Sequence, residues 1–131
     1  MNTISSKALK AVLILLGIYG IFLSIDFGVG GITSLGWQGE TEFLLVTNEA
    51  RYGVQDSNFR FFGGGFGVIG VLMIMSATNL KKYQEILNLM FRLIFVSGLM
   101  RFTSGNIALL SSAELSVAIF IEIVLMIVLC F

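Results

Sequence analysis

The chain lacks histidine and proline altogether, and it has a single cysteine, Cys130. Without histidine the sequence offers neither the usual zinc ligands nor the usual axial ligands of haem, and one cysteine forms no internal disulfide. Because proline is the commonest cause of sharp helix kinks, we expect fairly straight helices. We predict no metal site, no cofactor-binding site and no catalytic residues.

Charge is also scarce, since charged residues make up 12% of the 131 residues, about half the share of an ordinary soluble domain. Eight basic residues balance eight acidic ones, so no excess positive charge points to nucleic acid as a partner. Hydrophobic residues, by contrast, reach 56% of the chain. This composition predicts the lipid bilayer as the main partner.

Four segments are apolar over roughly the 17 to 25 residues that a membrane-spanning helix needs. We therefore predict an all-α fold, a single transmembrane domain over 1–131 in which an integral membrane four-helix bundle forms. Ser111 and Glu114 have the spacing of a capping box at the start of the fourth helix. The predicted spans are 9–25, 59–77, 86–102 and 115–131.

The basic residues next to the spans predict the orientation of the chain, because short loops rich in lysine and arginine stay on the cytoplasmic side. Lys7 and Lys10 precede the first span, and Lys81 and Lys82 lie between the second and third. Both termini should therefore be cytoplasmic, and residues 27–58 should be extracytoplasmic. The alternative for the first span is a cleaved signal peptide, but no A-x-A-like site follows it.

The predicted extracytoplasmic loop, residues 27–58, is too long for a simple hairpin turn. We expect it to form a cap over the outer ends of the helices, the alternative being a mere connector. Its glycine-rich first half contains Trp37, and Tyr83 lies beyond the second span; both are natural interfacial anchors. The second half mixes apolar and charged residues, and periodicity leaves a short strand pair or an interfacial helix open.

The second span contains a literal G-x-G-x-x-G in Gly65, Gly67 and Gly70. A dinucleotide-binding loop needs a preceding strand and a helix that starts within the motif, whereas these glycines lie inside a membrane-length helix. At about 100° per residue, Gly63, Gly67 and Gly70 share one face, and Gly64 and Gly65 point elsewhere. Glycines at this spacing predict close helix packing, either within the monomer or against another subunit.

Ionisable residues within apolar spans are costly in lipid and usually face a partner or a cavity. Arg60 and Arg101 should lie near the outer ends of the second and third helices, with Glu122 about two turns below the outer end of the fourth. Asp26, at the outer end of the first helix, can join them. Since one acid would face two arginines, we expect Asp26, Glu114 or an anionic ligand to balance the charge.

This predicted charged cluster has three interpretations. It is a paired network that fixes helix register, a polar pocket for a lipid headgroup or a lipophilic anion, or part of a route for protons or ions through Glu122. Arg92 lies nine residues before Arg101 and therefore on a nearly opposite helix face. It either contacts a second subunit or extends toward the cytoplasmic headgroups, while Glu85 lies two turns from it on the same face.

Three motifs carry a resemblance to a known family. They are the R-x-x-G-G from Arg60 to Gly64, the segment from Leu99 to Ser104 around Arg101, and Glu122 at the start of an apolar run. The chain resembles the domain of unknown function 4345 family, which consists of small bacterial four-helix integral membrane proteins. The resemblance implies this fold, a bacterial cytoplasmic membrane and a recurring charged set, and it brings no activity.

The sequence favours a non-enzymatic role, as an accessory or scaffold subunit of a membrane complex or as a homo-oligomer packed through glycine faces. The alternative is a binder or transporter of a small lipophilic or anionic molecule that uses Arg60, Arg101 and Glu122. An enzyme acting on lipid ranks third, because no nucleophile and base pair is evident. The expected partners are a second membrane protein or another copy of the chain, and a bound lipid.

Overall fold

A computed structural model describes residues 6–33 and 45–130 of the chain. Within these ranges the secondary structure consists of helices joined by turns, and no strand is present. The prediction of an all-α fold is confirmed. The chain divides into two compact units, the first over Ser6–Asn79 and the second beginning at Leu80, and each is described by itself.

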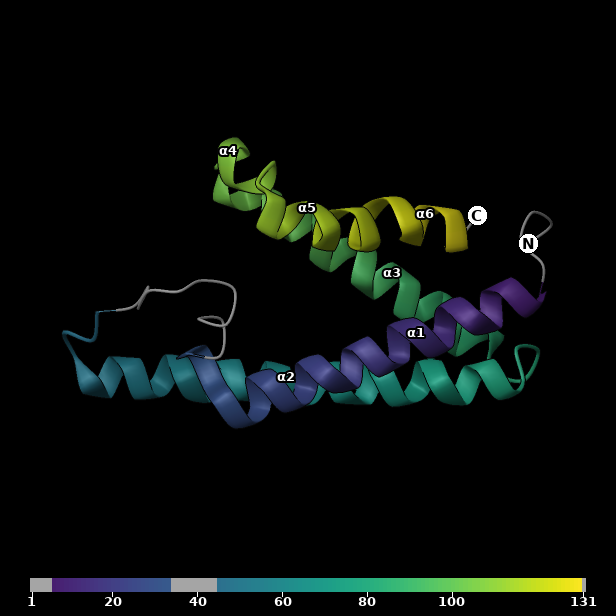
Figure 1. The fold of residues 1–131 in the computed structure, drawn as a ribbon, viewed down its shortest axis with the longest axis horizontal. Coiled ribbons are helices and arrows are strands. Elements are labelled where there is room, and N and C mark those ends of the chain that lie inside the picture. Colours follow the sequence, from purple (N-terminus) through teal and green to yellow (C-terminus); the bar gives the residue numbers. More distant parts are fainter. Residues whose placement is uncertain (1–5, 34–44, 131) are drawn as a thin grey trace. The chain divides into compact units, whose positions relative to one another are not determined.

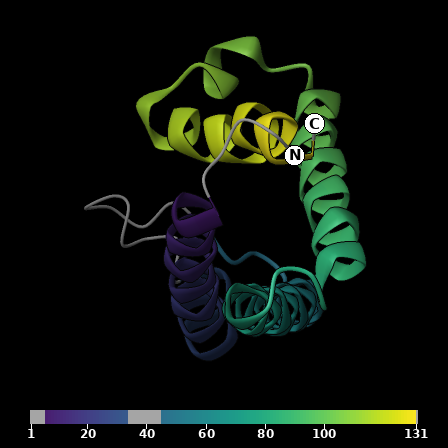
Figure 2. The same cartoon turned by 90° about the vertical axis from the view of Figure 1, so that its right-hand side faces the viewer.

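The first unit is a pair of helices that lie side by side (Figures 1 and 2). α1 extends over Ser6–Ile25 and passes directly into the π-helix η1, Asp26–Gly30, which is followed by a short 3-10 turn over 31–33. α2 covers Glu49–Thr78. Leu13 of α1 and Met73 of α2 are among the buried apolar side chains.

The structure extends helix into both ends of the predicted 27–58 loop. At its start, the first helix continues through η1 to residue 33. At its end, Asn48 caps α2 by accepting a hydrogen bond from the backbone N–H of Arg51, with Oδ1 and N 3.0 Å apart. α2 therefore begins at Glu49, ten residues before the predicted start at Phe59. The hydropathy pattern did not indicate this first part of the helix, because residues 49–58 are mostly polar.

The second unit begins with a turn over 80–83 and contains the third and fourth apolar helical stretches. The fourth stretch packs against the third through its last two segments. Phe91 and Met126 are buried, one from each stretch. The helical segments are α3 (Gln84–Met100), η3 (Arg101–Ser104), α4 (Ile107–Leu110), α5 (Ala113–Ile119), the π-helix η4 (Phe120–Leu125) and α6 (Met126–Cys130).

The predicted capping box at the start of the fourth helix is wrong. The N-cap of α5 is Ser112, and it makes no side-chain capping hydrogen bond. The hydroxyl of Ser111 instead donates to the carbonyl oxygen of Ile107, at 3.0 Å. Serine hydroxyls often satisfy themselves on the preceding helical turn, and the short helix α4 supplies that turn here.

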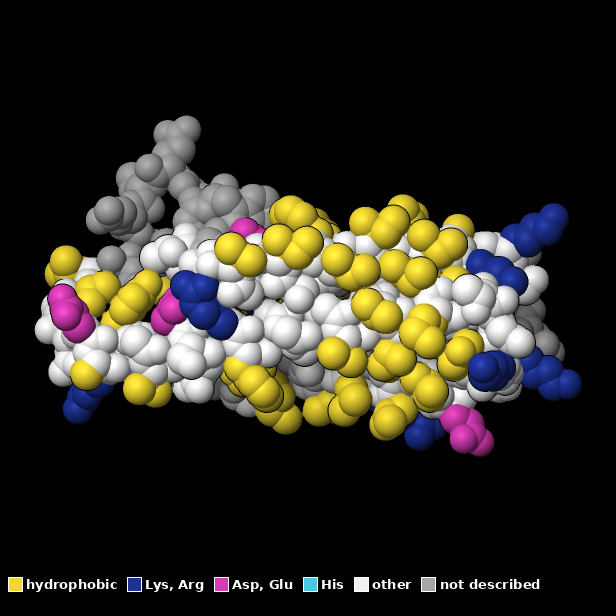
Figure 3. Space-filling model, turned by 90° about the horizontal axis from the view of Figure 1, so that it is seen from below, with side chains coloured by type: hydrophobic (Ala, Val, Ile, Leu, Met, Phe, Trp, Pro, Cys, Tyr) yellow, Lys and Arg dark blue, Asp and Glu magenta, His cyan; other side chains and the backbone are white. Residues whose placement is uncertain are grey.

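Three helical stretches are long and apolar enough to cross a membrane: Ser6–Thr33, Glu49–Thr78 and Gln84–Ser104. The fourth, Leu115–Leu129, is apolar but shorter. Figure 3 shows hydrophobic side chains over the middle of one face of α1 and α2, with charged side chains toward the ends. Such exposure of apolar side chains suits lipid as the surrounding medium.

The helices are less regular than the absence of proline led us to expect. η1 and η4 are π-helical insertions in the first and fourth stretches. Such insertions place one extra residue in a helical turn and occur often at functional positions. Asp26 lies in the first insertion and Glu122 in the second.

Candidate functional site

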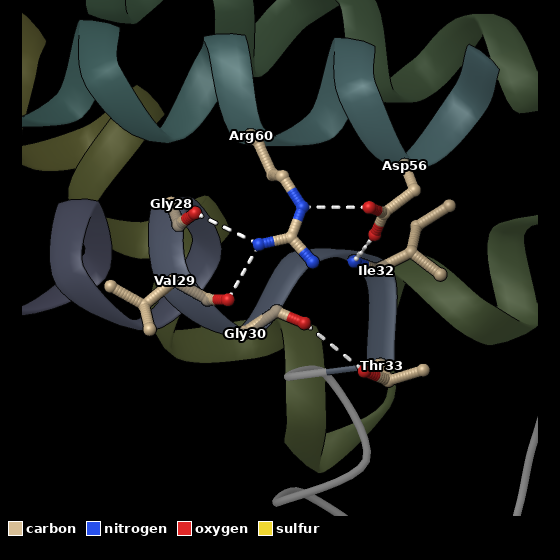
Figure 4. Close-up of polar contacts among 7 residues, drawn as sticks. All are labelled: Gly28, Val29, Gly30, Ile32, Thr33, Asp56 and Arg60. Atoms are coloured by element: carbon tan, nitrogen blue, oxygen red, sulfur yellow. Dashed lines mark hydrogen bonds and ion pairs between the residues drawn. The ribbon is translucent and has the colours of Figure 1, made fainter. Parts of the chain in front are cut away.

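Arg60 of α2 reaches the end of the first helix (Figure 4). Its Nε lies 2.6 Å from Oδ2 of Asp56, one turn earlier on the same helix. Its Nη1 donates to the carbonyl oxygens of Gly28, at 3.1 Å, and Val29, at 2.5 Å. One guanidinium therefore contacts a carboxylate on its own helix and the backbone of the neighbouring one.

This arrangement satisfies groups that a helix terminus leaves without partners. The last carbonyls of a helix carry partial negative charge, which the arginine neutralises. The other carboxylate oxygen of Asp56, Oδ1, accepts a hydrogen bond from the backbone N–H of Ile32 at 2.8 Å. Asp56 and Arg60 together therefore tie the end of the first helix to α2.

Gly31 makes this junction possible. Its φ is 70°, in the left-handed region that side chains other than glycine rarely adopt. A Cβ at this position would also overlap Asp56 Oδ1 and would lie 2.6 Å from Nη2 of Arg60. Both the backbone conformation and the available space therefore require glycine.

The predicted glycine face of α2, formed by Gly63, Gly67 and Gly70, points at the first helix of the same chain. A Cβ at Gly63 would lie 2.7 Å from the backbone nitrogen of Gly28. A Cβ at Gly70 would lie 2.6 Å from the carbonyl oxygen of Gly17. The space next to these three glycines is thus filled by α1 and η1.

Sequence reasoning missed the matching face of α1. A Cβ at Gly17 would lie 2.7 Å from the carbonyl oxygen of Gly70, and one at Gly20 would lie 3.1 Å from that of Phe66. Ser24 faces Gly67, with its Oγ 2.5 Å from where a Cβ would be. The signal was available, because Gly17, Gly20 and Ser24 are spaced by three and four residues and so share a helix face.

Gly64 and Gly65 differ from their neighbours. A Cβ built on either would meet nothing within 4 Å, and both residues are exposed. The exposed side chains of Phe61 and Val68 lie one turn before and after Gly64 on the same helix face. α2 therefore has a second glycine-containing face that points away from α1.

Arg101 and Glu122 form the second charged pair, and it lies within the second unit. Arg101 Nε is 2.6 Å from Glu122 Oε2, and Nη2 is 2.7 Å from Oε1, so the guanidinium holds the carboxylate in a two-pronged contact. Gly98 lies one turn before Arg101, and a Cβ there would be 2.7 Å from Cβ of Glu122. The missing side chain at Gly98 lets the glutamate approach the arginine.

The predicted charged cluster is therefore seen as pairs within each unit. The Arg101 and Glu122 contact was expected, whereas the carboxylate beside Arg60 belongs to Asp56, which the sequence analysis did not name. Aspartate four residues before arginine on a helix is a favourable pairing, so the signal was present. The proposed approach of Arg60 to Glu122 spans the two units and stays a prediction.

Asp26 belongs to neither pair. It lies in η1, and its Oδ2 is buried without a hydrogen-bond partner in the part of the chain that is described. Arg60 also differs in position from the prediction, because α2 begins at Glu49 and places this arginine about three turns into the helix. Its side chain nevertheless returns to the end of the first helix.

The two predicted interfacial aromatic residues have different outcomes. Tyr83 lies half-buried in the turn before α3, and the ammonium of Lys82 is 5.0 Å from the centre of its ring. Trp37 lies outside the described residues. Over 6–33 and 45–130, no group of three or more acidic or cysteine side chains could hold a metal ion.

These observations define a class: an all-α membrane protein with paired charges at the ends or within the turns of apolar helices. A model of the family described as a domain of unknown function, DUF4345, matches residues 8–131. The chain belongs to this family, and the resemblance seen in its motifs is confirmed. No curated protein and no solved structure matched the chain.

Proposed function

We propose that the protein is a non-enzymatic subunit of a membrane assembly, either as an accessory or scaffold subunit or as a homo-oligomer, in a bacterial cytoplasmic membrane with both termini inside. The observation that carries this proposal is the outward face of α2 around Gly64. There, Phe61 is 78% exposed and Val68 61% exposed, and a Cβ at the glycine would have open space around it. A neighbouring helix could approach closely at such a glycine.

The two glycine faces of α2 differ in what they contact, and this difference supports the proposal. Gly63, Gly67 and Gly70 are occupied by the first helix, so they hold the monomer together. Gly64 and Gly65 serve no packing contact among the described residues. Glycine lowers the stability of an exposed helix interior by roughly 1 kcal/mol relative to alanine. A helix that packs against α2 from outside the first unit would account for two such glycines.

The charged pairs favour a structural role over the binding or transport of a small lipophilic or anionic molecule. That alternative depended on an excess of positive charge at Arg60 and Arg101. Each arginine has a carboxylate partner, Asp56 and Glu122 respectively, so the electrostatic reason for an anionic ligand is weaker. Removing one partner of such a pair is more costly than removing both.

The test is to replace Gly64 by leucine and to measure assembly size by light scattering after extraction in mild detergent. We expect wild-type protein to extract as a complex and Gly64→Leu to yield a smaller species with unchanged helicity. Gly53→Leu is the matched control, because that glycine is also open but precedes the apolar span. A wild-type monomer, or a Gly64→Leu assembly of unchanged size, would contradict the proposal.

A further inference from the structure

Arg92 is the arginine within an apolar span that the charged pairs leave unexplained. It lies near the middle of the apolar helix α3, it is exposed, and the described residues of the second unit give it no hydrogen bond or ion pair. Arg60 and Arg101, by comparison, each hold a carboxylate. Because an isolated charge in an apolar span is costly, Arg92 needs a partner outside the described residues of the second unit.

The geometry of α3 indicates that the partner of Arg92 lies toward the N-terminus of this helix. Side chains on an α-helix lean toward its N-terminus, and the N-terminus of α3 follows the turn that contains Lys81 and Lys82. Arg92 stands six residues beyond Ile86, where the predicted span begins, so its backbone lies about 9 Å from that boundary. An extended arginine can cover most of this distance and place its guanidinium near the headgroups.

The same side of α3 carries apolar as well as charged side chains. At about 100° per residue, Glu85, Leu89 and Val96 share the face of Arg92, and all three are exposed. Leu89 is 59% exposed and Val96 47% exposed. Glu85 thus lies at the start of the helix, Leu89 lies between it and Arg92, beside the path of the arginine side chain, and Val96 lies one turn beyond Arg92.

The charges at this end of the second unit are mainly positive. Lys81 and Lys82 are exposed in the turn, and together with Arg92 they outnumber Glu85 by three charges to one. Lys82 rests over the ring of Tyr83, which is a typical interfacial side chain. A basic group at the membrane surface with apolar side chains next to it matches the two ends of an anionic phospholipid.

We propose that Arg92, with Lys81 and Lys82, binds the phosphate headgroup of an anionic phospholipid in the cytoplasmic leaflet. The acyl chains lie along Leu89 and Val96. The site is distinct from the pairs at Arg60 and Arg101, and it does not depend on the proposed role in a membrane assembly. A carboxylate on a partner protein would satisfy Arg92 alone, whereas a phospholipid headgroup also accounts for the two lysines.

The experiment places the full chain in phosphatidylcholine vesicles that contain a trace of spin-labelled phosphatidylglycerol or spin-labelled phosphatidylcholine. Electron paramagnetic resonance measures the fraction of each labelled lipid that the protein immobilises. We expect wild-type protein to prefer phosphatidylglycerol, and Arg92→Gln to lower this preference about fivefold at the site. Arg92→Lys should retain most of the preference.

Arg51→Gln is the matched control, since it removes one exposed positive charge from the first turn of α2, outside the second unit. It should leave the preference unchanged. Lys81→Gln repeats the test in the turn, without a substitution in a helix, and should lower the preference. The proposal is overturned if Arg92→Gln and Lys81→Gln leave the preference unchanged, if Arg51→Gln lowers it equally, or if Arg92→Gln instead releases a bound protein.

Discussion

Gly31 is the residue on which the junction between the first helix and α2 depends most. Its positive φ and the overlap that a Cβ would make with Asp56 both oppose any side chain. We predict that Gly31→Ala lowers the free energy of unfolding by about 1 to 3 kcal/mol. The measurement is reversible unfolding in mixed detergent micelles, followed by circular dichroism.

Gly53→Ala is the control for this substitution. Gly53 lies within α2, where a Cβ would meet nothing within 4 Å, so alanine there should be neutral or stabilising by up to about 1 kcal/mol. Equal stability of Gly31→Ala and wild type would show that the junction is not formed as described. The comparison separates the local strain from the general effect of replacing glycine.

Glu122 is the residue that neutralises Arg101. Glu122→Gln leaves the guanidinium without its carboxylate, and we predict destabilisation by about 1 to 3 kcal/mol, because the pair is part-buried. The double variant Arg101→Met, Glu122→Leu removes both charges and should recover most of the loss. The same unfolding measurement applies, and a double variant less stable than Glu122→Gln would contradict the structural role of the pair.

For single residues, the sequence predicted which arginines form charged pairs more reliably than it predicted their partners. The pairing of Arg101 with Glu122 was expected because both lie in apolar spans. The partner of Arg60 was missed because Asp56 lies in a polar stretch that the hydropathy pattern assigned to a loop. The burial of Asp26 Oδ2 was also not predicted, because it depends on the π-helix η1. No pattern of residues in the sequence indicates such a turn.

At the scale of elements, the contact between α1 and α2 depends on the close approach of two backbones. Gly67→Leu would push a side chain against Ser24, whose Oγ lies 2.5 Å from a Cβ at this position. We predict that this substitution destabilises the helix pair by about 1 to 3 kcal/mol or more, as overpacking does. Thermal unfolding of the variant in detergent measures the effect.

Gly53→Leu is the matched control, because it adds the same side chain to the same helix where a Cβ has open space, before the apolar span and away from the face around Gly64. It should unfold at nearly the wild-type temperature. If Gly67→Leu were as stable as Gly53→Leu, the face containing Gly67 would not pack against α1. The two variants together therefore test whether α2 packs against α1 at Gly67.

The long apolar segments predicted three of the membrane-length helices, because their hydrophobic runs are continuous. The start of α2 was not predicted from hydropathy, since residues 49–58 are polar while Asn48 supplies a good N-cap. The π-helical insertions η1 and η4 were also missed. They arise from the hydrogen bonding of the backbone, which a pattern of side chains reports only weakly.

At the scale of the whole molecule, the chain is a member of a family whose name states no activity. Its described residues nevertheless form three kinds of surface. They are the face of Gly63, Gly67 and Gly70 that packs within the first unit, the open face of α2 at Gly64, and the basic end of the second unit at Lys81, Lys82 and Arg92. The first stabilises the fold. We propose that the open glycine face contacts a protein neighbour, which is the basis of the proposed role, and that the basic end independently binds lipid.

Native mass spectrometry of the protein extracted gently from its own membrane tests the central claim most directly, because it weighs the chain together with everything that stays bound. The proposal of a membrane assembly predicts a mass that exceeds one chain by a partner protein or by whole copies of the chain. A single chain under the same conditions, alone or carrying only a small molecule, would contradict it.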